Sequence, residues 1–264
     1  MDKGKIIHLL ADFGQHSAEY TIAQALLYEK FPGCSIIFSH SGAQKGYMVP
    51  AIVFMKMVLG SFAPGSIHIC HISLRPEDPP VYLASPLNGG WILAPDNGLL
   101  PLIMENEEAI FYKLEIPEHL YDPFAQVYLP AAALLSTIQN EPIPLTVKDN
   151  PRKTGFIVPT LQGNSMRLGV LCNDASGNAI FNLKKDEFLR LSAGKPFRFR
   201  LPSIGQEINR IHAHINEVPL GFAAAFFGPG DFLQIAVNGG SAKQYLGLSE
   251  QKTILLEFNP SNAL

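Results

Sequence analysis

Residues 5–10 (KIIHLL) run directly into Ala11-Asp12-Phe13-Gly14, and this junction decides how the first half of the chain folds. A short apolar run that ends at a polar loop is typical of a buried strand. Residues 18–30 then carry apolar side chains at a spacing near 3.6, which predicts a helix that Pro32-Gly33 ends. The order of strand, loop and helix begins an α/β unit.

The same order continues along the chain. Residues 34–38 (CSIIF) and 66–72 (SIHICHI) are typical of strands, and a helix that begins at a proline is predicted between them at residues 50–62. Two further strands, residues 81–84 and 91–94, flank Asn88-Gly89-Gly90, which predicts a hairpin turn. Alternating strands and helices favour a largely parallel sheet, so we expect residues 1–150 to form an α/β domain.

The second half of the chain has a different pattern. Residues 147–154 (VKDNPRKT) are polar and predict a linker. Short strand-like runs separated by turn signals follow at residues 167–172, 179–182, 197–201, 211–215, 232–237 and 253–258. This pattern predicts an antiparallel barrel or sandwich over residues 151–264.

Composition excludes several classes of protein. Of the 264 residues, 47% are hydrophobic and 16% are charged, and the formal net charge is −3. The apolar content argues against disorder, and the lack of a basic stripe disfavours nucleic-acid binding. No run approaches the ~18 apolar residues of a membrane span, and the start of the chain does not resemble a signal peptide. We therefore expect a cytoplasmic protein without membrane contact, and the low charged fraction suggests that an oligomer covers part of its surface.

Cysteines and histidines give no sign of a metal site. The chain has three widely separated cysteines: Cys34, Cys70 and Cys172. This number and spacing exclude a disulfide framework and a CxxC site, so buried free thiols are expected. His68 and His71 lie three apart in a predicted strand and face opposite ways. His212 and His214 would share a strand face, but no third ligand is evident, so we expect no metal.

Polar residues gather where loops follow strands. Asp12 follows the first strand directly, and α/β sheets bind ligands beyond the carboxyl ends of their strands. A carboxylate there could accept hydrogen bonds from ribose hydroxyls, or it could serve as a turn or N-cap residue. Asp96-Asn97-Gly98 by itself predicts a tight turn. Residues 238–242 (NGGSA) follow an apolar strand and could read a base edge or form a strand-to-helix turn.

Five motifs in a fixed order point to one family. They are residues 11–14 (ADFG), 39–40 (SH), 94–100 (APDNGLL), 174–182 (DASGNAIFN) and 232–242 (FLQIAVNGGSA), the last followed by Leu246-Gly-Leu248. They are similar to the T-D-F-G, T-H, G-P-D-N-G-L-L, D-x-F-G-N-x-I-T-N and adenine-side motifs of the S-adenosyl-L-methionine (SAM) hydroxide adenosyltransferases. This family is related to the SAM-dependent fluorinase and chlorinase, and the resemblance covers most of the chain.

The resemblance implies an N-terminal α/β domain, a C-terminal antiparallel β-barrel domain and a homotrimer. SAM, as substrate or ligand and with no further cofactor, would lie between the N-domain of one subunit and the C-domain of the next. The binding residues implied are Asp12 at the ribose diol, Asp174 and Asn178 at the methionine part, and Asn238, Ser241 and Ala242 at the adenine, together with Ser17 and Asn97.

The chain departs from the family where the nucleophile is held. Hydrolysing members orient a water or hydroxide with an Asp, an Arg and a His. Here Ser73 stands at the Asp position and Pro123 at the His position. The loop at residues 71–78 (HISLRPED) is shortened, and Arg75 is the candidate for the Arg.

Other positions also differ from the family. Ser73, Pro76 and Phe124 do not reproduce the Tyr, Thr and Ser of the halogenases. Ser176 replaces the usual Phe of the D-x-F-G-N motif, and Ser17 replaces an acidic residue of the first loop. These changes remove contacts that the family makes with its ligand.

The family reaction is substitution at the 5′ carbon of SAM, with methionine leaving as a neutral thioether. A water nucleophile must also lose a proton, and a positioned base typically contributes ~10²–10⁴-fold. His71, Glu77 and Asp78 could supply a substitute base. The other interpretations are a partly buried structural histidine and a solvated acidic loop pair. The catalytic candidates are therefore Ser73, Arg75 and His71.

Two functions follow from these residues. The first is a SAM hydrolase-like enzyme with altered catalytic groups, which gives adenosine and methionine. The second is a catalytically silent relative that only binds SAM, adenosine or another adenosyl compound. A third possibility is a structural oligomer whose pocket has closed. The expected partners are a small adenosyl ligand and further copies of this chain.

Overall fold

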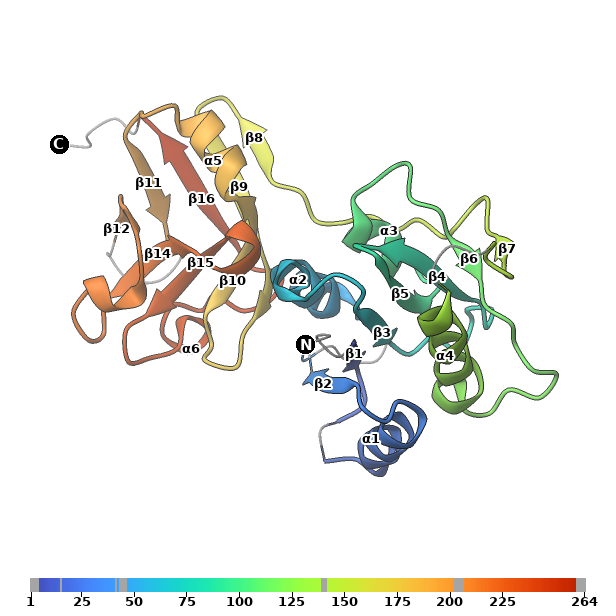
Figure 1. The fold of residues 1–264 in the computed structure, drawn as a ribbon. Coiled ribbons are helices and arrows are strands. Elements are labelled where there is room, and N and C mark those ends of the chain that lie inside the picture. The colour runs from blue at the N-terminus through green and yellow to red at the C-terminus, as the bar shows by residue number, and fades with distance from the viewer. Residues whose placement is uncertain are drawn as a thin grey trace. The chain divides into compact units, whose positions relative to one another are not determined.

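The computed structural model describes residues 5–14, 16–40, 42, 47–138, 142–201 and 207–259 (Figure 1). The chain divides into two compact units, Met1–Gly155 and Phe156–Leu264. Within the described ranges, no helix is both long and apolar enough to cross a bilayer.

The N-terminal unit is a sheet with helices. Its strands are β1 (Ile6–Ala11), β2 (Ser35–His40), β3 (Ile67–His71), β4 (Tyr82–Leu87), β5 (Gly90–Pro95), β6 (Tyr112–Lys113) and β7 (Thr146–Val147). Its helices are α1 (Ala18–Lys30), α2 (Val49–Val58), α3 (Leu99–Met104) and α4 (Leu129–Thr137), with a 3-10 turn η1 (Leu59–Ser61) and a π-helical turn η2 (Phe124–Tyr128). Among the described residues the strand order is β2-β1-β3-β5-β4-β6-β7.

The direction of the strands changes within this sheet. Strands β2, β1, β3 and β5 pair in parallel, as the sequence predicts. Strands β4, β6 and β7 are antiparallel to their neighbours. The change occurs at the predicted hairpin, where Asn88 (φ 47°) and Gly89 (φ 72°) both adopt the left-handed conformation of a tight turn and return the chain against β4. The sheet is therefore mixed rather than wholly parallel.

Side chains alternate between the two faces of the parallel strands. Ile7 and Leu9 of β1 belong to a core that also holds Leu27 of α1 and Ala132 of α4, so these two helices cover one face (Figure 1). On the opposite face His8 stacks on Phe62, which directly follows η1. Because α1 and α4 cover one face and Phe62 packs on the other, the carboxyl edge of the parallel strands is the place for a ligand.

The C-terminal unit is β-rich. Its strands are β8 (Thr160–Gln162), β9 (Ser165–Asn173), β10 (Ala179–Lys184), β11 (Phe197–Arg200), β12 (Glu207–Ile208), β13 (Ile211–His212), β14 (Ala223–Phe227), β15 (Phe232–Val237) and β16 (Thr253–Phe258). Its helices are α5 (Lys185–Ser192) and α6 (Ala242–Tyr245), with 3-10 turns η3 (Ile215–Glu217) and η4 (Pro229–Asp231). The described strands follow the order β12-β11-β16-β9-β10-β15-β14-β13, with β8 on β9.

This second sheet is nearly closed and barrel-like, and most of its strand pairs are antiparallel. The pair β13–β14 is parallel, so the antiparallel prediction holds only in part. The interior holds large apolar side chains such as Phe181, Phe199 and Leu233. Burying one such side chain stabilises the fold by about 1.5–3 kcal/mol. The shared interior therefore stabilises strands that are too short to be stable alone.

Two local predictions are wrong. Val147 of the predicted linker belongs to β7, because it pairs with Tyr112 of β6. The strand predicted at residues 211–215 ends at His212, and η3 begins at Ile215. His212 and His214 therefore do not share a strand face, and His212 Nδ1 lies 3.1 Å from Glu217 Oε2 instead. The described residues contain no cluster of three metal-binding side chains.

Candidate functional site

Asp12 joins the ends of two parallel strands. Its Oδ2 accepts a hydrogen bond from the Ser73 backbone N–H (2.8 Å), and its Oδ1 accepts one from Ser73 Oγ (3.1 Å). The Asp12 N–H donates to the carbonyl of His71 (3.2 Å). Asp12 is thus no N-cap; Ser17 caps α1 by accepting from the Tyr20 N–H (3.2 Å). Asp12 fixes the loop that follows β3.

A cavity of about 220 Å³ opens in the N-terminal unit beside this loop. Its lining includes Ser73, Arg75, Asp78, Asn97, Arg152 and Thr154. Ser73 and Asn97 each follow a strand, β3 and β5, and these strands are parallel neighbours. The cavity therefore lies at the carboxyl edge of the sheet, where α/β folds bind ligands.

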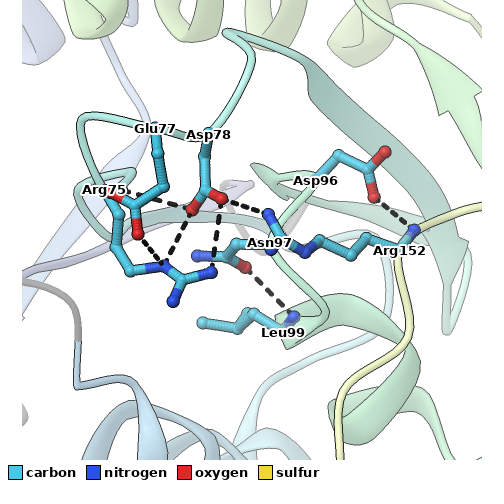
Figure 2. A network of polar contacts seen from close by, with 7 residues as sticks. All are labelled: Arg75, Glu77, Asp78, Asp96, Asn97, Leu99 and Arg152. Atoms are coloured by element: carbon cyan, nitrogen blue, oxygen red, sulfur yellow. Dashed lines mark hydrogen bonds and ion pairs between the residues drawn. The ribbon is translucent and has the colours of Figure 1, made fainter.

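Asn97 keeps its place through a local hydrogen bond. Its Oδ1 accepts from the Leu99 N–H (3.1 Å) at the start of α3, as Figure 2 shows. Gly98 has a φ of +95°, a conformation that disfavours any residue with a side chain. The predicted turn at Asp96-Asn97-Gly98 is confirmed, and it also presents Asn97 to the cavity.

Asp78 is the centre of an ion-pair network at the cavity (Figure 2). Its Oδ2 lies 3.2 Å from Arg75 Nε, and its Oδ1 lies 3.3 Å from Arg75 Nη2 and contacts Arg152 Nη1. Hydrogen bonds from Arg152 and then from Arg75 lower the pKa of Asp78 to about 2. The carboxylate is therefore charged at neutral pH, and its low pKa and two arginine partners make it a weak base.

His71 lies on the other side of β3 from His68 and is enclosed by aromatic rings. The ring centres of Phe13, Tyr128 and Phe124 lie 5.3, 5.5 and 6.1 Å away. Burial lowers the pKa of His71, and the charges of Asp12 and Asp122 partly oppose this shift. Its buried Nδ1 has no partner within the described part of the chain, and the described lining of the cavity does not include His71.

A second group of candidate residues forms in the C-terminal unit. Asp174 Oδ1 accepts from the N–H groups of Ser176 and Asn178 (both 2.9 Å), and its Oδ2 accepts from Asn178 Nδ2 (2.8 Å). Gly177 has a φ of +80°, and a Cβ there would lie only 2.0 Å from Ser241 Oγ. Residues 174–178 therefore pack against Ser241, which caps α6.

Asn238 and Ala242 are placed on either side of Ser241. Asn238 Nδ2 donates to the carbonyl of Val218 (2.7 Å), and its N–H donates to that of Phe222 (3.0 Å). The Ala242 side chain is fully buried. The neighbouring Phe222 and Tyr245 are large but exposed, at 51% and 64% of their surface. Sequence reasoning missed both aromatic residues, and their flat rings are suited to stacking on a base.

The comparisons with known proteins agree with the motifs. Residues 7–141 match the SAM hydroxide adenosyltransferase N-terminal domain, and residues 169–255 match the C-terminal domain of the same family. The chain belongs to the SAM hydroxide adenosyltransferase family. Membership supports an activity that uses SAM and transfers its adenosyl group in general. The search of curated proteins found no match.

Two solved structures share the fold of this SAM hydroxide adenosyltransferase homologue. An uncharacterized conserved protein from Thermotoga maritima has a TM-score of 0.82 at 21% identity, covering 95% of this chain and 99% of the other. A conserved hypothetical protein from Thermus thermophilus has a TM-score of 0.70 at 23% identity, covering 96% and 99%. At these identities the likeness concerns the fold alone.

The structure thus brings the candidates of this family member into two groups. In the N-terminal unit Asp12, Ser73, Arg75 and Asn97 are connected by contacts or by the shared cavity, whereas His71 and the capping Ser17 are not among the described lining residues. In the C-terminal unit Asp174, Asn178 and Ser241 form the second group. Sequence reasoning missed Arg152, because it lies in a polar stretch interpreted as a linker.

Proposed function

We propose that this chain transfers the adenosyl group of SAM to water, giving adenosine and methionine, with groups at the nucleophile that differ from the Asp, Arg and His of the family's hydrolases. The observation that carries the proposal is the polar cavity at the carboxyl edge of β3 and β5, in a chain whose two units both match the family. Ser73 and Arg75 are the proposed contacts of the water.

The chemistry requires little more than a held and desolvated water. A bond forms between the water oxygen and C5′, the C5′–S bond breaks, and methionine leaves with the electron pair as a neutral thioether. One proton passes to solvent. Ser73 donates its hydroxyl hydrogen to Asp12, so the lone pairs of Ser73 Oγ remain to accept a hydrogen bond from the water. Without a dedicated base, turnover should be ~10²–10⁴-fold slower than in an enzyme that has one.

The ligand is proposed to be shared between copies. A cavity of about 220 Å³ is smaller than the ~300–1,000 Å³ typical of sites that enclose a small-molecule ligand. We propose a homotrimer in which Asp174, Asn178, Asn238, Ser241 and Ala242 of a neighbouring copy complete the site.

The free cysteines are in keeping with a cytoplasmic protein.

A second function is favoured by the burial of His71. Aromatic rings enclose this histidine, and the arginine-paired Asp78 carboxylate is only a weak base, so neither is well suited to take a proton from a water in the cavity. A protein that binds SAM or adenosine without turnover would have the same family motifs and the same cavity.

Incubation with SAM in H₂¹⁸O separates the two functions. Adenosine that carries ¹⁸O at its 5′ hydroxyl, detected by chromatography and mass spectrometry, supports hydrolysis. Ser73→Ala and Arg75→Met should reduce its formation, whereas Arg190→Met, an exposed arginine of α5, should not. Heat of SAM binding by calorimetry with no adenosine supports the silent relative. Absence of both adenosine and binding would overturn the proposal.

A further inference from the structure

The segment between the two family matches contributes to the cavity. Residues 142–168 lie outside both matched stretches, yet Arg152 and Thr154 line the cavity with Ser73 and Asn97. A Cβ on Gly98 would lie 2.6 Å from Thr154 Cγ2, which shows how closely this segment packs on the 94–100 motif. A stretch that does not match the family is therefore part of the site.

Arg152 is held at two points. Its backbone N–H donates to Asp96 Oδ1 (2.7 Å), and its guanidinium Nη1 contacts Asp78 Oδ1 (Figure 2). Asp96 directly follows β5, and its N–H donates to the carbonyl of Val81 (2.8 Å). Arg152 therefore connects the end of β5 to the loop that follows β3.

Asp78 also binds Arg75, so it connects Arg152 to the Arg75 side chain. Its side chain is only 5% exposed, whereas those of Arg75 and Arg152 are 49% and 38% exposed. The Asp78 carboxylate accepts from the Arg75 backbone N–H (3.3 Å) and from Nε (3.2 Å) and Nη2 (3.3 Å). A buried charge without a partner is costly, so the two arginines that contact this nearly buried carboxylate stabilise it.

We infer that Arg152 is a positioning residue, which fixes the Asp78 carboxylate and through it holds the Arg75 guanidinium at the cavity that Ser73 also lines. The kinetic part of this inference rests on the proposed function. The part that concerns the conformational order of the Arg75 side chain does not depend on the proposed function. Glu77, which also lies 3.4 Å from Arg75 Nε, is 65% exposed and has no contact with Arg152 among the described residues, so it cannot replace this connection.

The first test measures Arg75 directly, with no ligand. In ¹⁵N relaxation of the Arg75 Nε–H group, we expect an ordered side chain in the natural protein and a mobile one in Arg152→Met and in Asp78→Asn. Lys153→Met removes a positive charge one residue away and should leave Arg75 ordered. Arg152→Lys keeps one cationic donor for Asp78 Oδ1 and should restore most of the order. An Arg75 that stays equally ordered in Arg152→Met would overturn the inference.

The second test uses adenosine formation. Misplacing a group by about 1 Å can cost up to ~10²-fold in rate, so we expect kcat to fall about 10-fold or more in Arg152→Met while KM changes far less. Asp78→Asn should cause a similar loss, and the double variant should be no slower than either single variant. Additive losses would contradict a shared path through Asp78. If the natural protein makes no adenosine, the proposed function fails, and the order of Arg75 still decides this inference.

Discussion

The buried pair His8 and His68 links stability to pH at the scale of single residues. The Nδ1 atoms lie 3.1 Å apart, and the Phe62 ring centre is 4.7 Å from each ring. Burial, and then the neighbouring His68, lowers the pKa of His8 from 6.5 to about 3, and burial lowers that of His68 to about 4. The unfolded chain therefore binds more protons below pH 6.5 than the folded chain does.

The folded chain keeps both imidazoles neutral, whereas the unfolded chain protonates them. Their contribution to the free energy of unfolding is therefore complete above about pH 6.5 and is lost as the pH falls toward 4. Between pH 7 and pH 5 the free energy of unfolding should fall by about 2 kcal/mol per histidine, as an upper value. Urea unfolding at the two pH values measures the change. The double variant His8→Leu/His68→Leu should show a smaller fall, whereas His16→Asn, at an exposed position, should not. An unchanged fall in the double variant would show that other groups cause it.

At the scale of elements, the β4–β5 hairpin depends on the absence of a side chain at Gly90. A Cβ there would lie 2.0 Å from the Ser66 carbonyl oxygen, which accepts a hydrogen bond from the Trp91 N–H (3.1 Å). Gly90→Ala must push the backbones of β5 and of the residue before β3 apart. We expect a loss of about 1–3 kcal/mol, the usual cost of overpacking.

The single tryptophan, Trp91, follows Gly90 and reports the hairpin by its fluorescence in urea. Gly60→Ala is the matched control, because no atom lies within 4 Å of an added Cβ and the φ of Gly60 is not in the left-handed region. This control should be neutral or stabilise by about 0.4–1 kcal/mol. Equal stability of Gly90→Ala and Gly60→Ala would show that the close approach to Ser66 is relieved at no cost.

Elements with a strong local pattern could be predicted from the sequence. Strands β15 and β16 match the predicted ranges 232–237 and 253–258, since each is a continuous apolar or alternating run with clear ends. Helix α5 was missed because its eight residues contain only a short apolar face between two strands. Arg152 could not be predicted, since its contacts with Asp78 and Asp96 join residues 74 and 56 positions apart in the chain. Local spacing carries no signal for such pairs.

At the scale of the whole molecule, the decisive prediction concerns which copy supplies each half of the site. Arg75→Met impairs the cavity of the N-terminal unit, and Asp174→Ala removes the carboxylate that organises residues 174–178 in the C-terminal unit. If each site combines the N-terminal unit of one copy with the C-terminal unit of the next, mixed trimers regain intact sites. With equal amounts and random assembly, about a quarter of the sites should be intact.

Refolding the two variants together and measuring adenosine release, or SAM binding where turnover is absent, tests this arrangement. Mixing Arg75→Met with Ser73→Ala is the control, because both changes lie in the same unit and no combination of copies restores it. Light scattering must show a mass three times that of one chain for each variant. Trimers that form but regain neither activity nor binding would mean that both halves of a site come from one chain. A site built across copies would in turn make stability and ligand affinity depend on protein concentration, because dissociation would separate Ser73 from the Asp174 of its neighbour.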